Sequence, residues 1–196
     1  MHTLNNRSVQ DTLQRLHQLF REQFEKRSKE SSTNLDAYTS VSEDEGKLLY
    51  FLADYAQAQN IVEFGGSFGI STIYLAAAAQ NNGGMVTTTE MEPNKVAAAQ
   101  GNLMDAGLLE YVNILMGDAL NTLHSAKSPI DFVFLDGAKE LYMPVFNILR
   151  KKLSHRAVIT AYNADAEFSG YFMNAKDNFT AVKLMEGRLL VAYYYE

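Results

Sequence analysis

The residues of this sequence that are best suited to chemistry are glycines and acids that directly follow short apolar runs. The run at residues 61–64 contains Glu63 and is followed by Gly65, Gly66 and Gly69. Glycines at such a turn let the backbone bend sharply and approach a ligand closely. The strict GxGxxG spacing is absent, and an ordinary strand-to-helix turn could use the same glycines. The stretch therefore favours a nucleotide-like ligand without identifying the reaction.

Acids also follow the second and third runs. Glu90 lies about 20 residues beyond the glycines, where an acid can accept hydrogen bonds from ribose hydroxyls. It could equally be a solvated acid at a strand end, and Glu92 is close enough to be confused with it. Asp118 could accept a hydrogen bond from an adenine amino group, or it could cap the next helix. Each position therefore has both a binding and a structural interpretation.

The fourth and fifth runs carry the candidate reactive groups. Asp136 ends the fourth run, Lys139 follows three residues later, and Asn163 follows the fifth run. An acid and an amine at this spacing could bind a cation and take up a proton, or they could form a surface salt bridge. Ligands of doubly wound sheets bind at the carboxyl ends of the strands. Five polar strand ends therefore indicate a site more strongly than any single motif.

The elements that must position these groups alternate along the chain. Strand-like runs lie at about 60–64, 85–89, 111–116, 130–135 and 156–161, and helical patterns lie at 70–80, 93–106, 119–125 (a short turn) and 140–153. Strands that alternate with helices predict βαβ units and a mainly parallel sheet covered on both faces. Two final strand-like runs, 179–185 and 188–195, flank Glu186 and Gly187 and predict a hairpin.

The N-terminal part is expected to be helical. Apolar residues recur at helical spacing over residues 8–28, which predicts an amphipathic helix, and the polar stretch 28–33 predicts a loop. Ser42 and Glu45 have the spacing of a capping box at the start of a second helix. We expect one domain over residues 1–196, with residues 1–40 as a helical extension.

Composition excludes several classes of protein. The chain has 196 residues, 47% of them hydrophobic, a net charge of -6 and no cysteine. A nucleic-acid partner would need a basic face, and the basic residues do not cluster beyond 150–152. No apolar run approaches the roughly 20 residues that span a bilayer. The N-terminus lacks an apolar signal-peptide core. Together with the missing cysteines, this predicts a cytoplasmic protein without nucleic-acid or membrane partners.

Taken together, these pieces resemble a known family. The segments VSEDEGKLL (41–49), VEFGGSFGIS (62–71), TEMEP (89–93), GDA (117–119) and FLDGAKELY (134–142) resemble class I S-adenosylmethionine-dependent methyltransferases of the catechol / caffeoyl-CoA O-methyltransferase type, O-methyltransferase family 3. They cover roughly residues 38–163 in the order and spacing of that family. The ensemble is specific, although each segment alone is not.

The resemblance implies a fold and an activity. The fold would be α/β, a Rossmann-like seven-stranded, mainly parallel sheet with an antiparallel last strand and helices on both faces. The activity would be methyl transfer from S-adenosylmethionine to a small hydroxylated, aromatic acceptor. Lys139, together with Asp136, would be the catalytic pair, with Lys139 as the candidate base. A homodimer with contributing N-terminal helices is common in the family.

The resemblance also implies the cofactor-binding residues. Glu63, Gly65, Gly66 and Ser71 would surround the methionine part, Glu90 would bind the ribose, and Met91 would pack on the adenine. The full set is Ser42, Glu63, Gly65, Gly66, Ser71, Glu90, Met91, Asp118, Ala119, Asp136 and Tyr142.

Departures from the family concern the metal and the acceptor. Asp136 and Asn163 match two positions that hold a divalent metal, but the third position is Tyr162, a poor replacement for a hard carboxylate ligand. We therefore expect weak or absent magnesium binding. The Gly-Gly turn before the fifth strand is replaced by residues 154–156, and the segment after Asn163 is short. These departures leave open an alternative: a homologue that binds the cofactor, has lost or altered activity and serves a binding or regulatory role.

Overall fold

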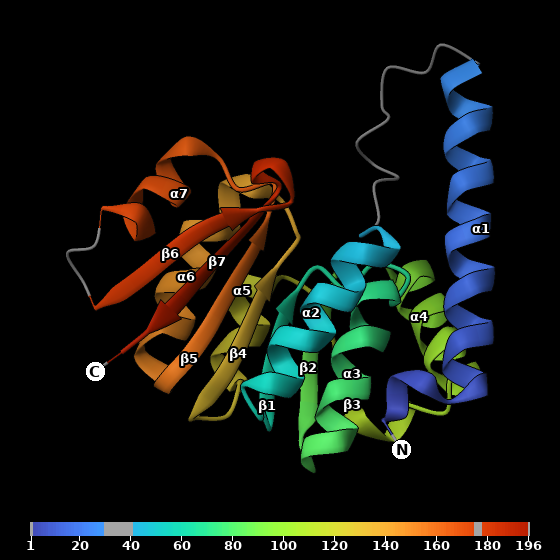
Figure 1. Cartoon of the computed structure of the whole chain (residues 1–196), viewed down its shortest axis with the longest axis horizontal. Coiled ribbons are helices and arrows are strands. Elements are labelled where there is room, and N and C mark those ends of the chain that lie inside the picture. Colours follow the sequence, from blue (N-terminus) through green and yellow to red (C-terminus); the bar gives the residue numbers. More distant parts are fainter. Residues whose placement is uncertain (1, 30–40, 175–177, 196) are drawn as a thin grey trace.

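The computed structural model describes residues 2–29, 41–174 and 178–195. Its sheet has seven strands in the order β3-β2-β1-β4-β5-β7-β6 (Figure 1). The strands are β1 (Asn60–Phe64), β2 (Met85–Glu90), β3 (Val112–Met116), β4 (Ile130–Leu135), β5 (Leu153–Tyr162), β6 (Phe179–Leu184) and β7 (Leu189–Tyr194). The helices are α1 (Arg7–Lys29), α2 (Glu43–Tyr55), α3 (Ile70–Asn82), α4 (Pro93–Asp105), α5 (Ala119–Thr122), α6 (Tyr142–Leu149) and α7 (Ala166–Met173).

The sheet has the predicted topology. β1 pairs in parallel with both β2 and β4, so the strand order reverses between β1 and β4. β7 lies between β5 and β6 and is antiparallel to both, and it forms the predicted hairpin with β6. The order confirms the predicted α/β fold, in which the last strand, β7, is antiparallel. It also brings the carboxyl ends of β1 to β5 to one edge of the sheet, where ligands of such folds bind.

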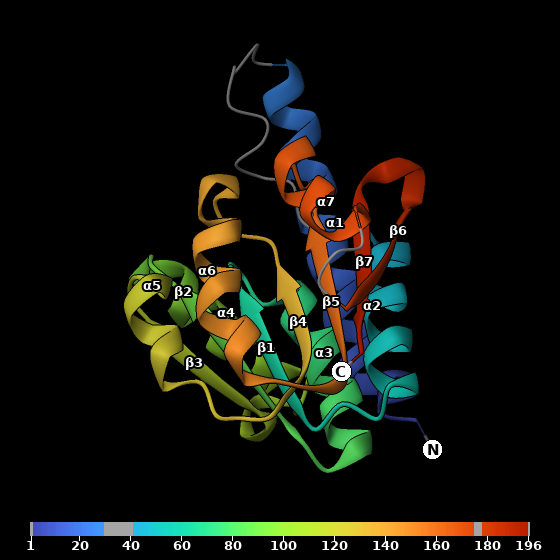
Figure 2. The ribbon, with the colours of Figure 1, turned by 90° about the vertical axis from the view of Figure 1, so that its left-hand side faces the viewer.

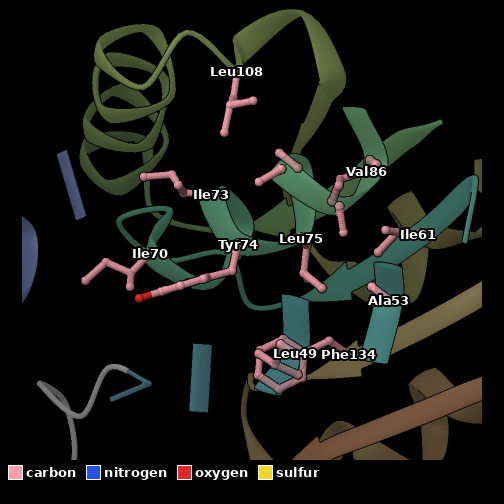
Figure 3. Close-up of a cluster of buried hydrophobic side chains, with 14 of the residues drawn as sticks. Leu49, Ala53, Ile61, Ile70, Ile73, Tyr74, Leu75, Val86, Leu108 and Phe134 are labelled. Carbon is pink, nitrogen blue, oxygen red and sulfur yellow. The ribbon is translucent and has the colours of Figure 1, made fainter. Parts of the chain in front are cut away.

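Two apolar layers hold the helices to the sheet. α2 and α3 pack on one face, whereas α5, α6 and α7 pack on the other (Figure 2). Every residue from 70 to 79 in α3 is buried, as expected of a helix that is apolar all round. Figure 3 shows Tyr74 of α3 within the cluster on the α2 side. A Cβ at Gly46 of α2 would collide with the Tyr74 ring, so this glycine lets the two helices approach closely.

α1 confirms the predicted amphipathic helix. Val9 and Leu13 are buried against the domain, and Arg15 forms an ion pair of 2.9 Å with Asp105 of α4. The predicted loop at 28–33 begins later than expected, because α1 runs to Lys29; its remaining residues lie outside the described ones. None of the helices in the described residues is long and apolar enough to cross a membrane. The predicted cytoplasmic location stays a prediction.

The region before β5 differs from the expectation in detail. The predicted helix at 140–153 is divided into a 3₁₀ turn, α6 and a second 3₁₀ turn that ends at Lys152. β5 begins at Leu153 instead of residue 156, and its register with β4 shifts after the Leu153 pair. Arg156 has a left-handed φ of 76°. The strand therefore accommodates residues 154–156 as an irregularity within its length, where the family pattern has a glycine turn.

Candidate functional site

A cavity of about 730 Å³ lies at the carboxyl ends of the parallel strands. Its walls come from the loops after β1, β2, β3, β4 and β5, which is the edge that the sequence predicted. The predicted site residues that line it are Gly65, Glu90, Met91, Ala119, Asp136, Lys139, Tyr162 and Asn163. The predicted residues Ser42, Glu63, Gly66, Ser71, Asp118 and Tyr142 are not among its lining residues.

The glycine turn after β1 is fixed by the neighbouring strand. The backbone N–H groups of Gly65 and Gly66 both donate to the carbonyl of Thr89, at 3.2 and 2.9 Å. Gly65 has a φ of 95°, and a Cβ there would lie 2.7 Å from the backbone nitrogen of Gly137. The loops after β1 and β4 therefore touch through glycine backbone, which requires the absence of a side chain.

Glu90 and Glu92 have different partners. The Glu90 carboxylate accepts hydrogen bonds from the backbone N–H groups of Ser67, Met91 and Glu92, at 3.0, 2.7 and 2.9 Å. The Glu92 carboxylate instead forms an ion pair of 2.6 Å with Lys95. Glu90 is thus anchored at the cavity wall, and its remaining lone pairs can accept from a ligand. The sequence did not single out Ser67, although its place among the glycines was a signal.

Glu63 supports the glycine turn from below. It is fully buried, and its Oε2 accepts a hydrogen bond of 2.5 Å from Thr72 Oγ1. Burial raises the pKa of Glu63, whereas the nearby hydroxyls of Ser71, Thr72 and Thr88 lower it. Gly66 lies against Thr88, whose hydroxyl would collide with a Cβ at that position. Glu63, Gly66 and Ser71 therefore shape the loop rather than the cavity surface.

Two further predicted residues are helix caps. Asp118 accepts a hydrogen bond of 2.8 Å from the backbone N–H of Leu120, so the capping interpretation is confirmed; its contact with adenine stays a prediction. Ala119, the next residue, lines the cavity. Ser42 and Glu45 form the predicted capping box at the start of α2.

Lys139 lies in a network of tyrosines and one acid. Its Nζ donates to Tyr142 Oη at 2.7 Å and lies 3.6 Å from Asp136 Oδ1. Tyr142, which is buried, donates in turn to the backbone carbonyl of Tyr162 at 2.7 Å. Burial raises the pKa of Asp136 to about 7, although the nearby Lys139 ammonium lowers it. Burial also lowers the pKa of Lys139. Both shifts favour proton exchange near neutral pH, which suits acid–base chemistry.

Tyr162 is tied to a residue that the sequence analysis missed. The Arg188 guanidinium lowers the pKa of Tyr162, and Arg188 Nη1 lies 2.9 Å from Oε1 of the buried Glu45. The backbone N–H of Asn163 donates to the carbonyl of Arg188 at 2.6 Å. Arg188 follows the hairpin turn and is far from Glu45 in sequence, so no local pattern could have shown this pairing.

The donor set does not fit a tightly held magnesium ion. Magnesium prefers hard oxygen ligands such as carboxylates. Tyr162 offers a phenol, and burial raises its pKa above the ordinary value for tyrosine, which keeps it neutral at physiological pH. The carboxylate of Asp136 already faces the ammonium of Lys139.

Comparisons with known proteins agree with this architecture. The model of the O-methyltransferase family matches residues 10–186. The catechol O-methyltransferase of Niastella koreensis is 40% identical over 111 residues, which are 55% of this chain and 50% of that protein. The chain thus spans about half the length of this curated relative.

Two solved structures share both fold and sequence with the chain. Cofactor-bound Rv0187 from MTB has a TM-score of 0.71 and 29% identity over 80% of this chain and 82% of that chain. The O-methyltransferase TomG from Streptomyces achromogenes, in complex with SAM, has a TM-score of 0.68 and 27% identity over the same shares.

Proposed function

This chain belongs to the O-methyltransferase family, and from that premise we propose that it transfers the methyl group of S-adenosylmethionine to a hydroxyl of a small aromatic molecule. The observation that carries the proposal is the meeting of three features in one cavity: the Gly65 turn, the anchored Glu90 carboxylate and the Lys139–Asp136 pair. The names of the relatives support it, since one is a catechol O-methyltransferase and another was solved with SAM.

The cofactor would span the carboxyl ends of β1, β2 and β3. Glu90 would accept hydrogen bonds from the ribose hydroxyls, as acids at this strand end do in related folds. Met91 is 66% exposed and lines the cavity, so its thioether is available to pack on the adenine. Ala119 would contact the adenine edge, and the backbone at Gly65 would lie against the methionine part.

The reaction would be an in-line displacement. The acceptor oxygen forms a bond to the methyl carbon while the bond from that carbon to sulfur breaks, which turns the sulfonium into a thioether. The hydroxyl proton would pass to the deprotonated form of Lys139, which burial makes more accessible by lowering the Lys139 pKa, with Asp136 beside it. The protein contributes alignment of the acceptor with the methyl group and a base of suitable pKa. No step is assigned to a metal, because the donor set at Tyr162 does not fit one.

Calorimetric titration and turnover test this function. S-adenosylmethionine and its demethylated product should both bind, and catechol should be methylated in the presence of a chelator. Lys139→Ala should abolish turnover while cofactor binding stays. Absence of cofactor binding would refute the proposal. Tight cofactor binding without turnover of any phenolic acceptor would instead favour the binding or regulatory homologue.

Magnesium dependence has its own test. Turnover of the unmodified protein should not fall when a chelator removes magnesium. Tyr162→Asp restores a carboxylate at the third ligand position, so added magnesium should stimulate this variant. Strong magnesium dependence of the unmodified protein would contradict the expected weak or absent metal binding.

We also infer a homodimer with contributions from the N-terminal helices. Phe51 and Tyr55 on α2 are 57% and 81% exposed, and their rings stack at 5.9 Å. Leu19 and Phe24 on α1 are exposed as well. An exposed apolar pair such as Phe51 and Tyr55 is typical of an interaction surface.

A further inference from the structure

The amine of Lys139 is held by the hydroxyl of a neighbouring tyrosine. Lys139 lies in the 3₁₀ turn Lys139–Leu141, and Tyr142 begins α6 directly after it. Side chains three residues apart in such a turn lie almost one above the other. Lys139 Nζ donates to Tyr142 Oη at 2.7 Å and lies 4.8 Å from the centroid of the same ring. The local turn therefore brings the amine and the hydroxyl together.

The direction of this hydrogen bond does not depend on the charge of the amine. The Tyr142 hydroxyl donates its own proton to the backbone carbonyl of Tyr162 at 2.7 Å, so its oxygen accepts from Lys139. Burial raises the pKa of Tyr142, which keeps that proton on the phenol. Tyr142 is also not among the residues that line the cavity. It is therefore an acceptor for the amine and not itself a base for a ligand.

Asp136 attracts the same amine without directing it. Its Oδ1 lies 3.6 Å from Lys139 Nζ, which is an ion-pair distance but too long for a well-formed hydrogen bond. The centroid of the Tyr162 ring lies 5.7 Å from Nζ. Because the lysine stem is flexible, charge attraction alone would leave several orientations of the amine open. The Tyr142 hydroxyl supplies the directed contact.

We propose that Tyr142 is a positioning residue that orients Lys139 for proton abstraction. One N–H of the amine stays on Tyr142 Oη, so the lone pair of the deprotonated form can face an acceptor hydroxyl in the cavity that Lys139 lines. A base must lie within hydrogen-bond reach of the proton that it takes and be aligned with it. This role differs from the cofactor contact that the family resemblance implies for Tyr142. It rests on the proposed function, because it takes Lys139 as the base.

The hydroxyl of Tyr142 can be removed without the ring. The buried ring makes edge-on contacts with Phe64 and Phe168, at centroid distances of 6.3 and 5.4 Å, and Tyr142→Phe keeps both. Tyr74→Phe is the matched control. Tyr74 is equally buried, and its hydroxyl shares a hydrogen bond of 3.1 Å with His17, away from the cavity. The two variants should therefore unfold at similar temperatures.

Two acceptors distinguish a positioning role from a structural one. Catechol must lose its hydroxyl proton to a base, whereas 4-nitrocatechol is largely ionised in mildly alkaline solution, because its nitro group withdraws electrons. Tyr142→Phe should lower kcat for catechol about tenfold, a part of what a general base contributes, and leave KM within about twofold. It should change kcat for 4-nitrocatechol by less than about twofold, because an ionised acceptor needs no base.

Tyr74→Phe should change turnover of neither acceptor. An equal loss for both acceptors with Tyr142→Phe would indicate a structural role and overturn the proposal. An unchanged kcat for catechol, or a loss that appears only in KM, would overturn it as well.

A structural measurement separates failure of this proposal from failure of the proposed function. If the unmodified protein methylates no phenolic acceptor, the proposed function fails, and crystal structures decide the positioning. Lys139 Nζ should lie within about 3.2 Å of Tyr142 Oη in the unmodified protein. In Tyr142→Phe it should move by about 1 Å or more, or occupy several conformers. Lys139 in one unchanged conformer in both proteins, or away from Tyr142 in the unmodified one, would refute the role with or without catalysis.

Discussion

At the scale of single residues, the cavity's acids are distinguished by what holds them. Glu90 accepts from three backbone N–H groups, which orient its carboxylate without neutralising its charge. The Glu92 carboxylate forms a surface ion pair with Lys95. Asp136 faces an ammonium but remains mostly buried. The same residue type is therefore suited to ligand binding, to surface pairing and to proton exchange at three neighbouring places.

Replacing Glu90 should weaken cofactor binding. Glu90→Ala removes the proposed acceptor for the ribose hydroxyls and also releases the backbone of the glycine turn. Hydrogen bonds to a charged group are worth about 1.5–3 kcal/mol, so the dissociation constant should rise by about 10- to 150-fold. Calorimetry with the demethylated cofactor measures this change. Glu92→Ala is the control and should stay within a few-fold; an equal effect of both variants would show that the two acids were assigned wrongly.

Asp136 should make stability depend on pH. Its folded-state pKa of about 7 exceeds the ordinary value of 3.8, so the folded protein keeps a proton that the unfolded chain gives up. The stabilisation is fully present below about pH 4 and is lost as the pH rises to about 7. The unmodified protein should lose stability across this window, whereas Asp136→Asn does not titrate and should not. The free energy of unfolding of the variant should therefore rise relative to that of the unmodified protein as the pH increases. At about 1.4 kcal/mol per pKa unit, the gain is at most about 4 kcal/mol.

Denaturant unfolding between pH 4 and pH 8 measures this difference. Glu140→Gln is the matched control, because it removes an exposed carboxyl from the same turn. A difference between Asp136→Asn and the unmodified protein that stays constant with pH would contradict the raised pKa.

The sequence could place about half of the residues that line the cavity, but not their contacts. Gly65, Glu90 and Asp136 were predictable because each follows a strand-like run, and parallel strands bring their carboxyl ends to one edge. Asp118 could not be decided, since capping and ligand binding use the same acceptor atoms. Arg188 was not predictable, because its pairing with Glu45 joins distant parts of the chain through the fold.

At the scale of elements, the turn from β1 to α3 requires glycine both for its conformation and for its lack of a side chain. Gly65 needs a φ of 95° and also needs space, since the backbone of Gly137 lies against it. Gly83 follows the end of α3 and has a left-handed φ of 68°. Glycine is required there only for this backbone conformation, because a Cβ would meet nothing within 4 Å. Substitutions at Gly83 therefore test conformational strain alone, whereas substitutions at Gly65 test conformational strain together with a steric collision.

Alanine at these two positions should have unequal effects. Gly83→Ala should lower the free energy of unfolding by about 1–2 kcal/mol, the cost of a left-handed conformation for a residue with a Cβ. Gly65→Ala should cost about 1–3 kcal/mol more, because overpacking against the loop after β4 adds to that strain. Chemical denaturation gives both values. If the two variants lose the same free energy of unfolding, the loop after β4 moves aside at little cost and the predicted collision is wrong. Gly65→Ala should then bind the cofactor normally.

β5 shows where element prediction ends. The run at 156–161 was recognisable from its β-branched and apolar residues, but the strand begins at Leu153, before that run. A left-handed Arg156 and a register shift absorb the extra residues. Such irregularities depend on how β5 pairs with β4. A local sequence pattern holds no information about that pairing.

At the scale of the whole molecule, α2 joins two parts of the fold, since Glu45 near its start pairs with Arg188 of the hairpin turn. The opposite end of α2 carries the stacked pair Phe51 and Tyr55. In Figure 1, α1 lies at the far right and β6 and β7 lie at the left, with α2 between them. A second copy that covers this end of α2 would bury the two stacked rings.

The dimer is tested by making this face polar. The unmodified protein should sediment as a dimer, and the double variant Phe51→Ser, Tyr55→Ser should sediment as a monomer. Both side chains are largely exposed in the single chain, so each substitution should change the free energy of unfolding of the monomer by no more than about 0.5 kcal/mol. Met104→Ser is the control, because Met104 is an exposed apolar residue on α4. A monomeric unmodified protein, or a double variant that remains dimeric, would contradict the interface, since burial of these two rings supplies its apolar core.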